Sequence, residues 1–232
     1  MPSVDDTTFL GLRTLLVTGT GHYHLVGTQS SGGDTIPDYT VDAGANFYIQ
    51  KALRWCDRHA RHCRKLEKAD VTVGADVSSV AVTAHSVTEV RITDQTTPLL
   101  QADEDWLRKE LDEADLTAVA SALKPLYWAP KMGEADDTTR SIWIMPPPTA
   151  AKTAEVRGMY YTAALSGDSD TNWWTLNFSE LVLYVAMQMV NDLDLNPFTN
   201  ATLMRLIEDV KRQMIIDDVQ EEVAYNGTTM AG

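Results

Sequence analysis

The 232-residue sequence predicts an α+β protein with a mainly helical body and an inserted β-rich region. Two observations support this class. Apolar residues recur at helical spacing near both ends of the chain, whereas segments rich in Val, Ile, Thr and Tyr lie in the middle. The expected parts are a helical body of residues 1–70 and 164–224, a β-rich insertion of residues 71–163 with one surface helix, and a C-terminal tail of residues 225–232.

The first part of the body is predicted from its apolar spacing and its glycines. Phe9–Val17 is a short helix candidate, and the Gly- and Ser-rich segment Gly27–Asp34 is expected to be a loop. Residues 42–65 are expected to form the first long helix. On such a helix Ile49 and Cys56 lie on one side, opposite a row of basic residues.

The insertion reads as short strands with one charged helix. Residues 71–93 hold two or three strands, in which Thr88, Val90 and Ile92 alternate and are expected to share one face. Residues 103–113 begin with acidic side chains, which favour a helix N-terminus, and form the surface helix. Residues 141–145 and 155–163 are predicted to be a further strand pair, joined by the turn that contains three consecutive prolines at 146–148.

The sequence predicts the structure of the segment from Gly158 to Val190 in more detail than that of any other segment. A strand rich in Met and Tyr leads through an acidic turn to Asn177, which is a good helix N-cap, with Glu180 three places later. The helix that follows, at 177–193, is almost entirely apolar from Leu181 on, so it is expected to be buried on all sides. It is too short to cross a bilayer, which needs about 20 apolar residues.

The last helix, at 197–224, opens at Asn196–Pro197, because proline is favoured in the first helical turn. Its apolar stripe consists of Leu203, Ile207, Val210 and Met214. The tail at 225–232 has almost no apolar surface, so alone it is expected to be disordered.

The segment from Gly158 to Val190 and the last helix resemble the head–tail adaptor proteins of tailed bacteriophages. The residues that carry the resemblance are the Tyr160–Tyr161 strand, Leu165–Ser166, the turn from Asp170 to Trp174, Leu183–Tyr184 in the buried helix, and the final amphipathic helix. Upstream, the segments 46–55, 87–92, 126–129 and 142–148 fall in the order of the family, so the resemblance covers roughly residues 40 to 225.

The resemblance implies a structural virion protein of the head–tail neck, assembled in the host cytoplasm, and not an enzyme. It implies a ring of twelve copies between the portal protein and the next neck or tail protein, which is a stopper, nozzle or terminator. The ring would extend the channel through which genomic DNA passes without specific binding. The end of the last helix and the tail are then expected to dock on a partner, with the portal first, through Asp217, Asp218, Glu221, Glu222 and Tyr225.

The formal net charge of −14 argues against general binding to nucleic acid, because phosphate contacts require Lys and Arg. One segment opposes the trend, since 7 of the 19 basic residues lie between Lys51 and Lys68. The residues that recur there at helical spacing are Arg54, Arg58, Arg61, Lys65 and Lys68. This stripe is either the solvated face of an amphipathic helix or a contact with DNA or an acidic neighbouring subunit. In an acidic oligomer we favour the subunit contact, with residues 103–113 as a candidate partner.

Two patterns have the residue types of metal ligands but lack a complete motif. Cys56, His59 and Cys63 share a helix face, yet arginines surround them and no second Cys pair exists. The first three positions of a calcium loop are matched by Asp168, Asp170 and Asn172, but the glycine and the final glutamate of such a loop are missing. We therefore expect no catalytic residues, cofactor, metal or membrane contact. The alternatives are a small acidic cytoplasmic enzyme of unknown reaction and a DNA-contacting protein that uses the basic helix 51–68.

Overall fold

The computed structural model describes residues 5–31, 33–60, 66–112, 115–119, 124–131, 140–193 and 197–229. The chain is α+β, as predicted, with 42% of residues helical and 30% in strands. Strands are thus a substantial part of the fold, and the expectation of a mainly helical protein is not confirmed. The chain divides into two compact units, one formed by residues 1–63 and 162–232 and the other by residues 64–161.

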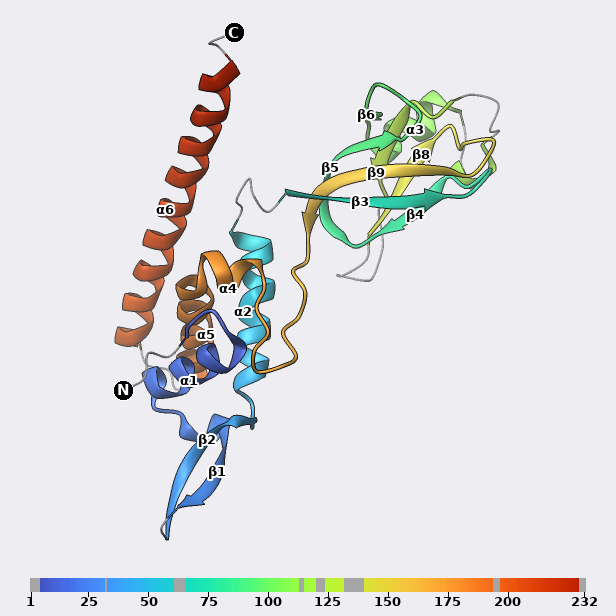
Figure 1. Ribbon diagram of the computed structural model, residues 1–232. Helices are drawn as coiled ribbons and strands as arrows, with labels where there is room; N and C mark the ends of the chain where they lie inside the picture. The colour runs from blue at the N-terminus through green and yellow to red at the C-terminus, as the bar shows by residue number, and fades with distance from the viewer. Residues whose placement is uncertain are drawn as a thin grey trace. The chain divides into compact units, whose positions relative to one another are not determined.

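The first unit begins with helix α1 (Phe9–Thr20), which Thr8 caps and Gly21 ends. Gly21 has a φ of 75°, the left-handed conformation that glycine adopts most readily at a helix C-terminus. After a single 3-10 turn (Tyr23–Leu25), strands β1 (Val26–Ser31) and β2 (Asp34–Asp42) form an antiparallel hairpin. Figure 1 shows this hairpin projecting from the helices of its unit. The predicted loop at Gly27–Asp34 is therefore wrong, because residues 27–31 lie in β1 and Asp34 begins β2.

Helix α2 (Ala45–His59) follows the hairpin directly. It begins later than the predicted residue 42, because Asp42 ends β2 and its carboxylate accepts hydrogen bonds from the backbone N–H groups of Gly44 and Asn46. It ends at His59, and the predicted extension to residue 65 lies outside the described residues. Ile49 and Cys56 are buried on one side of α2, as the spacing predicted.

The second half of this unit contains helices α4 (Trp173–Asn177), α5 (Ser179–Leu193) and α6 (Pro197–Thr229). The predicted start of the buried helix at Asn177 is wrong. Asn172 caps α4 instead, in a capping box with Thr175, and Asn177 is the last residue of α4, where its side-chain amide donates to the Trp173 carbonyl. Helix α6 continues five residues past the predicted end at 224, into the segment expected to be a disordered tail.

The core of the first unit gathers α1, α2, α5 and one face of α6 around Trp174. Leu181, Val182, Val185 and Ala186 of α5 are almost fully buried, in agreement with the prediction of a buried helix. Leu203, Ile207 and Met214 of α6 are also buried, and Val210 packs against the same core. The apolar stripe of the last helix is thus confirmed, and it attaches α6 to its own unit.

The second unit contains two sheets. Strands β3 (Leu66–Val73), β9 (Lys152–Tyr160) and β5 (Ala84–Ile92) form one sheet, in the order β3–β9–β5. Strands β4 (Ser79–Val82), β8 (Arg140–Met145), β7 (Tyr127–Pro130) and β6 (Leu100–Gln101) form the other, in the order β4–β8–β7–β6. The predicted strand pair is wrong, because β8 and β9 belong to different sheets.

The two sheets share one apolar core that includes Val90 and Val156 from the first sheet and Trp128 and Ile144 from the second. Residues 71–93 form three strands, within the two or three predicted. Thr88 is exposed whereas Val90 and Ile92 are buried, because a register shift between Val87 and Glu89 breaks the expected alternation. Helix α3 (Glu104–Glu110) and a 3-10 turn (Leu116–Ala118) cover the other face of the second sheet, where Leu107 packs in a cluster with Trp143.

Candidate interaction surfaces

The outer face of α2 carries the basic residues that the sequence singled out. Lys51, Arg54 and Arg58 are exposed, and Phe47 on the same helix is 56% exposed. The Lys51 ammonium lies 4.7 Å from the centre of the Phe47 ring, so a cation covers the exposed aromatic side chain. This face of α2 therefore combines positive charge with an exposed aromatic side chain.

The predicted continuation of the stripe beyond α2 is only partly described. Arg61 and Lys65 lie outside the described residues. Lys68 is not on the helix, as the helical spacing required, but on β3, where its ammonium is 2.9 Å from the Glu155 carboxylate of β9. The basic residues at 51–68 therefore do not form one helical stripe, because the chain leaves the helix before Lys68.

The second half of α6 carries aliphatic side chains that its own unit does not cover. Ile215 is 60% exposed, Ile216 is 47% exposed and Val219 is 53% exposed, all after the last buried residue of the stripe, Met214. Figure 1 shows this half of α6 continuing beyond the other helices of its unit. Large aliphatic residues grouped on an exposed helix indicate a binding surface.

The predicted acidic contacts of α6 follow the same exposed group. Asp217 and Asp218 are half-buried on this helix, and an amide N–H of Gln213 donates to the Asp217 carboxylate at 3.0 Å. Glu221, Glu222 and Tyr225 are helical, but their side chains lie outside the described residues. The described part of this surface is thus apolar, with acidic residues beside it.

The buried carboxylate of Asp57 links α2 to the segment after β9 and to α4. Its two oxygens accept hydrogen bonds from the backbone N–H of Thr162 at 2.9 Å, the Thr162 hydroxyl at 2.7 Å and the indole N–H of Trp174 at 2.6 Å. Asp57 is 4% exposed. The sequence reasoning missed this residue, although its position four residues after the buried Leu53 places it beside the apolar side of α2.

A second buried polar centre lies at Arg13 on α1. Its guanidinium donates to the Tyr39 carbonyl at 2.7 Å and to the Asn46 side chain at 3.0 Å, and it pairs with Asp168 at 3.2 Å. One side chain thus joins α1, the hairpin, α2 and the acidic turn. Asp57 and Arg13 thus link the N-terminal and the C-terminal segments of the first unit.

The acidic turn uses its side chains for structure. The Asp170 carboxylate accepts hydrogen bonds from the backbone N–H groups of Ser166 and Gly167 and from the Ser166 hydroxyl, and these bonds lower the pKa of Asp170 below its usual value. Asp168 pairs with Arg13, and Asn172 caps α4. The three side chains that matched the start of a calcium loop therefore each have a protein partner.

The Cys and His residues on α2 are separated by their surroundings. Cys56 is buried, which raises the pKa of its thiol far above the usual value, whereas the His59 ring is exposed and stacks on Trp55 at 4.8 Å. Cys63 lies outside the described residues. Within the described segments, no group of three or more His, Cys, Asp or Glu side chains is placed to hold a metal ion. None of the helices searched in those segments has the length and apolarity needed to cross a membrane.

The β-rich unit has an exposed apolar surface that sequence reasoning did not identify. Leu100 is 64% exposed, Leu126 is 51% exposed and Trp106 is 38% exposed. Leu100 and Trp106, with Tyr127, line a cavity of about 580 Å³ beside β6, which is the edge strand of its sheet. Tyr127 is distant from Leu100 and Trp106 in sequence, and the pairing of β6 with β7 brings it beside them.

Comparison with known proteins identifies the family. The family model for the SU10 adaptor protein matches residues 24–223, which is most of the chain. A search of curated proteins gives no match. The matched range includes the hairpin, the β-rich unit, Asp57 with its hydrogen-bond partners and most of α6. The chain therefore belongs to the SU10 adaptor protein family, which is a family of phage head–tail adaptors with a structural role.

Proposed function

We propose that this chain forms the adaptor ring between the portal and the tail, with twelve copies in one ring. The ring extends the DNA channel and provides the attachment surface for the next neck or tail protein, a stopper, nozzle or terminator. It assembles in the host cytoplasm and remains in the virion. Membership of a phage head–tail adaptor family supports this role.

The observation that carries the proposal is the exposed aliphatic group on α6. Ile215, Ile216 and Val219 are about half exposed, although fully burying one such side chain contributes about 1.5–3 kcal/mol. A helix that is attached up to Met214 and exposed at the residues that follow it can reach a second protein without loosening its own core. The portal is the partner that we assign to it.

The proposed channel carries DNA without holding it. The net charge of −14 per chain makes the ring strongly acidic, and phosphates are repelled by carboxylates. Because charges act over about 8 Å at physiological salt, the side chains that line the channel decide this effect rather than the total charge.

Measurement of mass in solution tests the ring itself. The purified chain alone and mixed with portal is examined by native mass spectrometry and by imaging of the complex. We expect twelve copies of the chain on each portal ring. A fixed small oligomer that does not associate with portal would overturn the proposal.

Removal of the apolar group on α6 is expected to weaken attachment to portal. Ile216→Asp places a charge where the proposed interface buries an aliphatic side chain, so we expect binding about 30-fold weaker, which corresponds to about 2 kcal/mol. Deletion of residues 224–232 is expected to weaken attachment further, because ordering the end of the chain on the portal is part of the same contact. The readout is the dissociation constant for portal.

Met204→Asp is the matched control, because Met204 is 56% exposed on the first half of the same helix. It is expected to leave portal binding unchanged. Ile216→Asp and Met204→Asp should retain the circular dichroism and melting temperature of the natural chain, since both residues are exposed. The truncated chain lacks residues 224–229 of α6, so it should lose only their helical signal. Full-strength binding by both Ile216→Asp and the truncated chain would show that α6 does not contact the portal.

Charge reversal on the outer face of α2 is expected to weaken ring assembly. In the proposed ring, the basic residues of α2 meet acidic residues of a neighbouring subunit, with Asp105 and Glu110 of α3 as exposed candidates. Arg54→Glu should reduce assembly at low salt by about tenfold while changing the stability of the single chain by no more than about 1 kcal/mol, as for an exposed charge. Analytical ultracentrifugation over protein concentration gives both the assembly constant and the species present.

Arg140→Glu provides the control for net charge, since it makes the same change at an exposed position of β8. It should assemble normally. Adding Asp105→Arg to the Arg54→Glu chain should restore assembly if the two residues meet. Normal assembly of Arg54→Glu at every salt concentration would show that this face of α2 is only solvated.

A further inference from the structure

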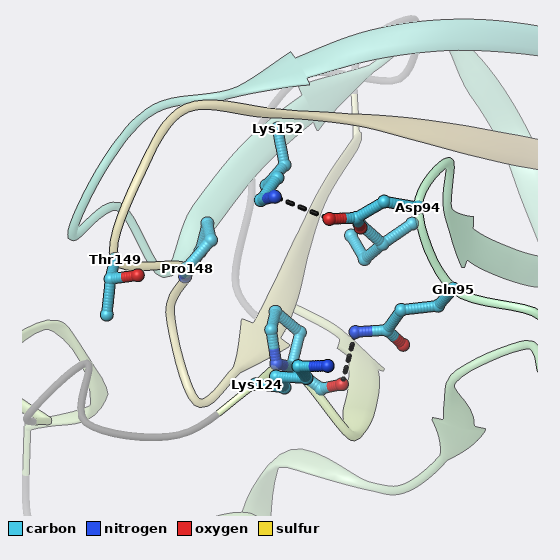
Figure 2. A pocket seen from close by; sticks show the side chains of 8 residues that line it. Asp94, Gln95, Lys124, Pro148, Thr149 and Lys152 are labelled. Carbon is cyan, nitrogen blue, oxygen red and sulfur yellow. Dashed lines mark hydrogen bonds and ion pairs between the residues drawn. The ribbon is translucent and has the colours of Figure 1, made fainter.

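A small cavity opens in the β-rich unit where three loops meet. The turn after β5, the segment before β7 and the loop between β8 and β9 line a volume of about 210 Å³ (Figure 2). The lining residues are Ile92, Asp94, Gln95, Lys124, Pro125, Pro148, Thr149 and Lys152. They come from separate parts of the chain, so the fold and not a local motif creates this site.

The floor of the cavity is apolar and its rim is polar. Ile92, Pro125 and Pro148 are buried, whereas the side chains of Lys124 and Thr149 are exposed. An amide N–H of Gln95 donates to the Pro125 carbonyl at 3.1 Å, which connects two of the three loops. The cavity therefore offers apolar contact below and hydrogen-bond donors above, which is the usual composition of a ligand site.

Positive charge prevails at the rim. Two ammonium groups, from Lys124 and Lys152, lie around one carboxylate, that of Asp94, which gives a local net charge of +1 in a chain whose total is −14. Lys152 forms an ion pair with Asp94 (Figure 2). The hydrogen bond from Lys152 lowers the pKa of Asp94, and the charges of Lys152 and Lys124 lower it further. Both ammonium groups thus act on the same small region.

Hydrogen-bond capacity remains at this rim. An ammonium group has three N–H donors, and Asp94 accepts one of those of Lys152. Among the residues that the structure describes, Lys124 has no hydrogen-bond partner and the Thr149 hydroxyl has none either. Donors from three side chains therefore surround a cavity whose lining is partly polar and partly apolar, and an anion is the ligand that accepts from all of them.

The size of the cavity limits the ligand. Pockets for drug-sized molecules and cofactors measure about 300–1,000 Å³, so a volume of about 210 Å³ suits one amino-acid side chain or one terminal residue. A ligand that is charged on all sides, such as phosphate, gains nothing from the apolar part of this lining. A carboxylate on a short aliphatic group satisfies both the floor and the rim.

We propose that this cavity, here called the Lys124–Lys152 pocket, binds a carboxylate on a short aliphatic group of a protein partner, as at a C-terminal residue. The carboxylate oxygens accept from Lys124, Lys152 and Thr149. The aliphatic group packs on Ile92, Pro125 and Pro148. The pocket lies within one chain, so this inference does not depend on the proposed ring.

Saturation-transfer NMR on the full-length chain tests the pocket, because this method detects weak binding to a single chain and to a large assembly alike. The probes are N-acetyl-leucine, its uncharged amide, acetate and inorganic phosphate. We expect N-acetyl-leucine to bind at least tenfold more tightly than the amide and than acetate, and phosphate to compete poorly. Lys124→Gln should weaken binding of N-acetyl-leucine by about tenfold.

Two further variants make the result independent of simple damage to the fold. Asp94→Asn removes the carboxylate that competes for Lys152, so it should tighten binding by several-fold. Lys109→Gln changes an exposed lysine on α3 outside the pocket and should have no effect. Equal binding of N-acetyl-leucine and its amide, unchanged binding by Lys124→Gln, or phosphate as the strongest ligand would each overturn the proposal.

Discussion

Replacement of Asp57 by alanine is expected to reduce the free energy of unfolding by about 3–5 kcal/mol, the largest effect of any single substitution considered for this chain. The change leaves the backbone N–H and hydroxyl of Thr162 and the indole N–H of Trp174 without their acceptor. Trp174 is fully buried, so water cannot replace the carboxylate at its indole nitrogen. Urea denaturation followed by circular dichroism measures the loss.

Two variants bracket this result. Asp57→Asn retains one acceptor oxygen and should lose less stability than Asp57→Ala. Asp209→Ala removes an exposed carboxylate of α6 that is 3.9 Å from Arg212, and it should change stability by no more than about 0.5 kcal/mol. The free energy of unfolding of Asp57→Ala could instead lie within about 1 kcal/mol of that of the natural chain, which is on the order of one ordinary hydrogen bond. The contacts among α2, Thr162 and Trp174 would then not depend on this carboxylate.

Replacement of Arg13 by methionine is expected to destabilise the first unit by about 3 kcal/mol, because it removes a buried guanidinium and leaves its half-buried acceptors without a donor. Methionine has a similar reach but cannot donate to the Tyr39 carbonyl or the Asn46 side chain. It also removes the ion pair with Asp168, whose side chain is 45% exposed and can turn to water. The carbonyl and the amide are therefore expected to account for most of the loss, measured by the same denaturation experiment.

Arg13→Lys distinguishes charge from geometry. Lysine keeps the positive charge, but its single ammonium cannot reproduce the fork of N–H groups. We therefore expect the free energy of unfolding of Arg13→Lys to lie between that of the natural chain and that of Arg13→Met. Arg205→Met changes an exposed arginine on α6 and should have little effect. A lysine variant as stable as the natural chain would mean that charge alone holds this centre.

Several features of the fold were predictable because they depend on residues close together in the sequence. The apolar run from Leu181 predicts a buried helix, and Leu203, Ile207 and Met214 predict the face by which α6 attaches. Both depend on helical periodicity, which each segment carries by itself. The strands of residues 71–93 were predictable from their local richness in Val, Ile and Thr, although the alternation expected at Thr88 was wrong.

Other features depended on pairing between distant segments. The Gly- and Ser-rich segment at 27–34 forms part of a hairpin because the segment up to Asp42 pairs with it, a contact that its composition does not reveal. The strands β8 and β9 are adjacent in sequence but join different sheets, and their side chains meet only in the apolar core that the two sheets share. The end of α2 at His59 likewise separates Lys68 from the basic helix and gives it Glu155 as a partner.

The sequence by itself thus determined the adaptor resemblance, the acidic charge, the buried helix and the attached face of α6, because periodicity, composition and residue order are local properties. The tertiary structure alone decided which polar residues are buried and which loops meet. Asp57 became the acceptor for Thr162 and Trp174 only when α2 and the returning chain came together. The Lys124–Lys152 pocket exists only where three loops converge. Such sites depend on long-range packing, which no local pattern encodes.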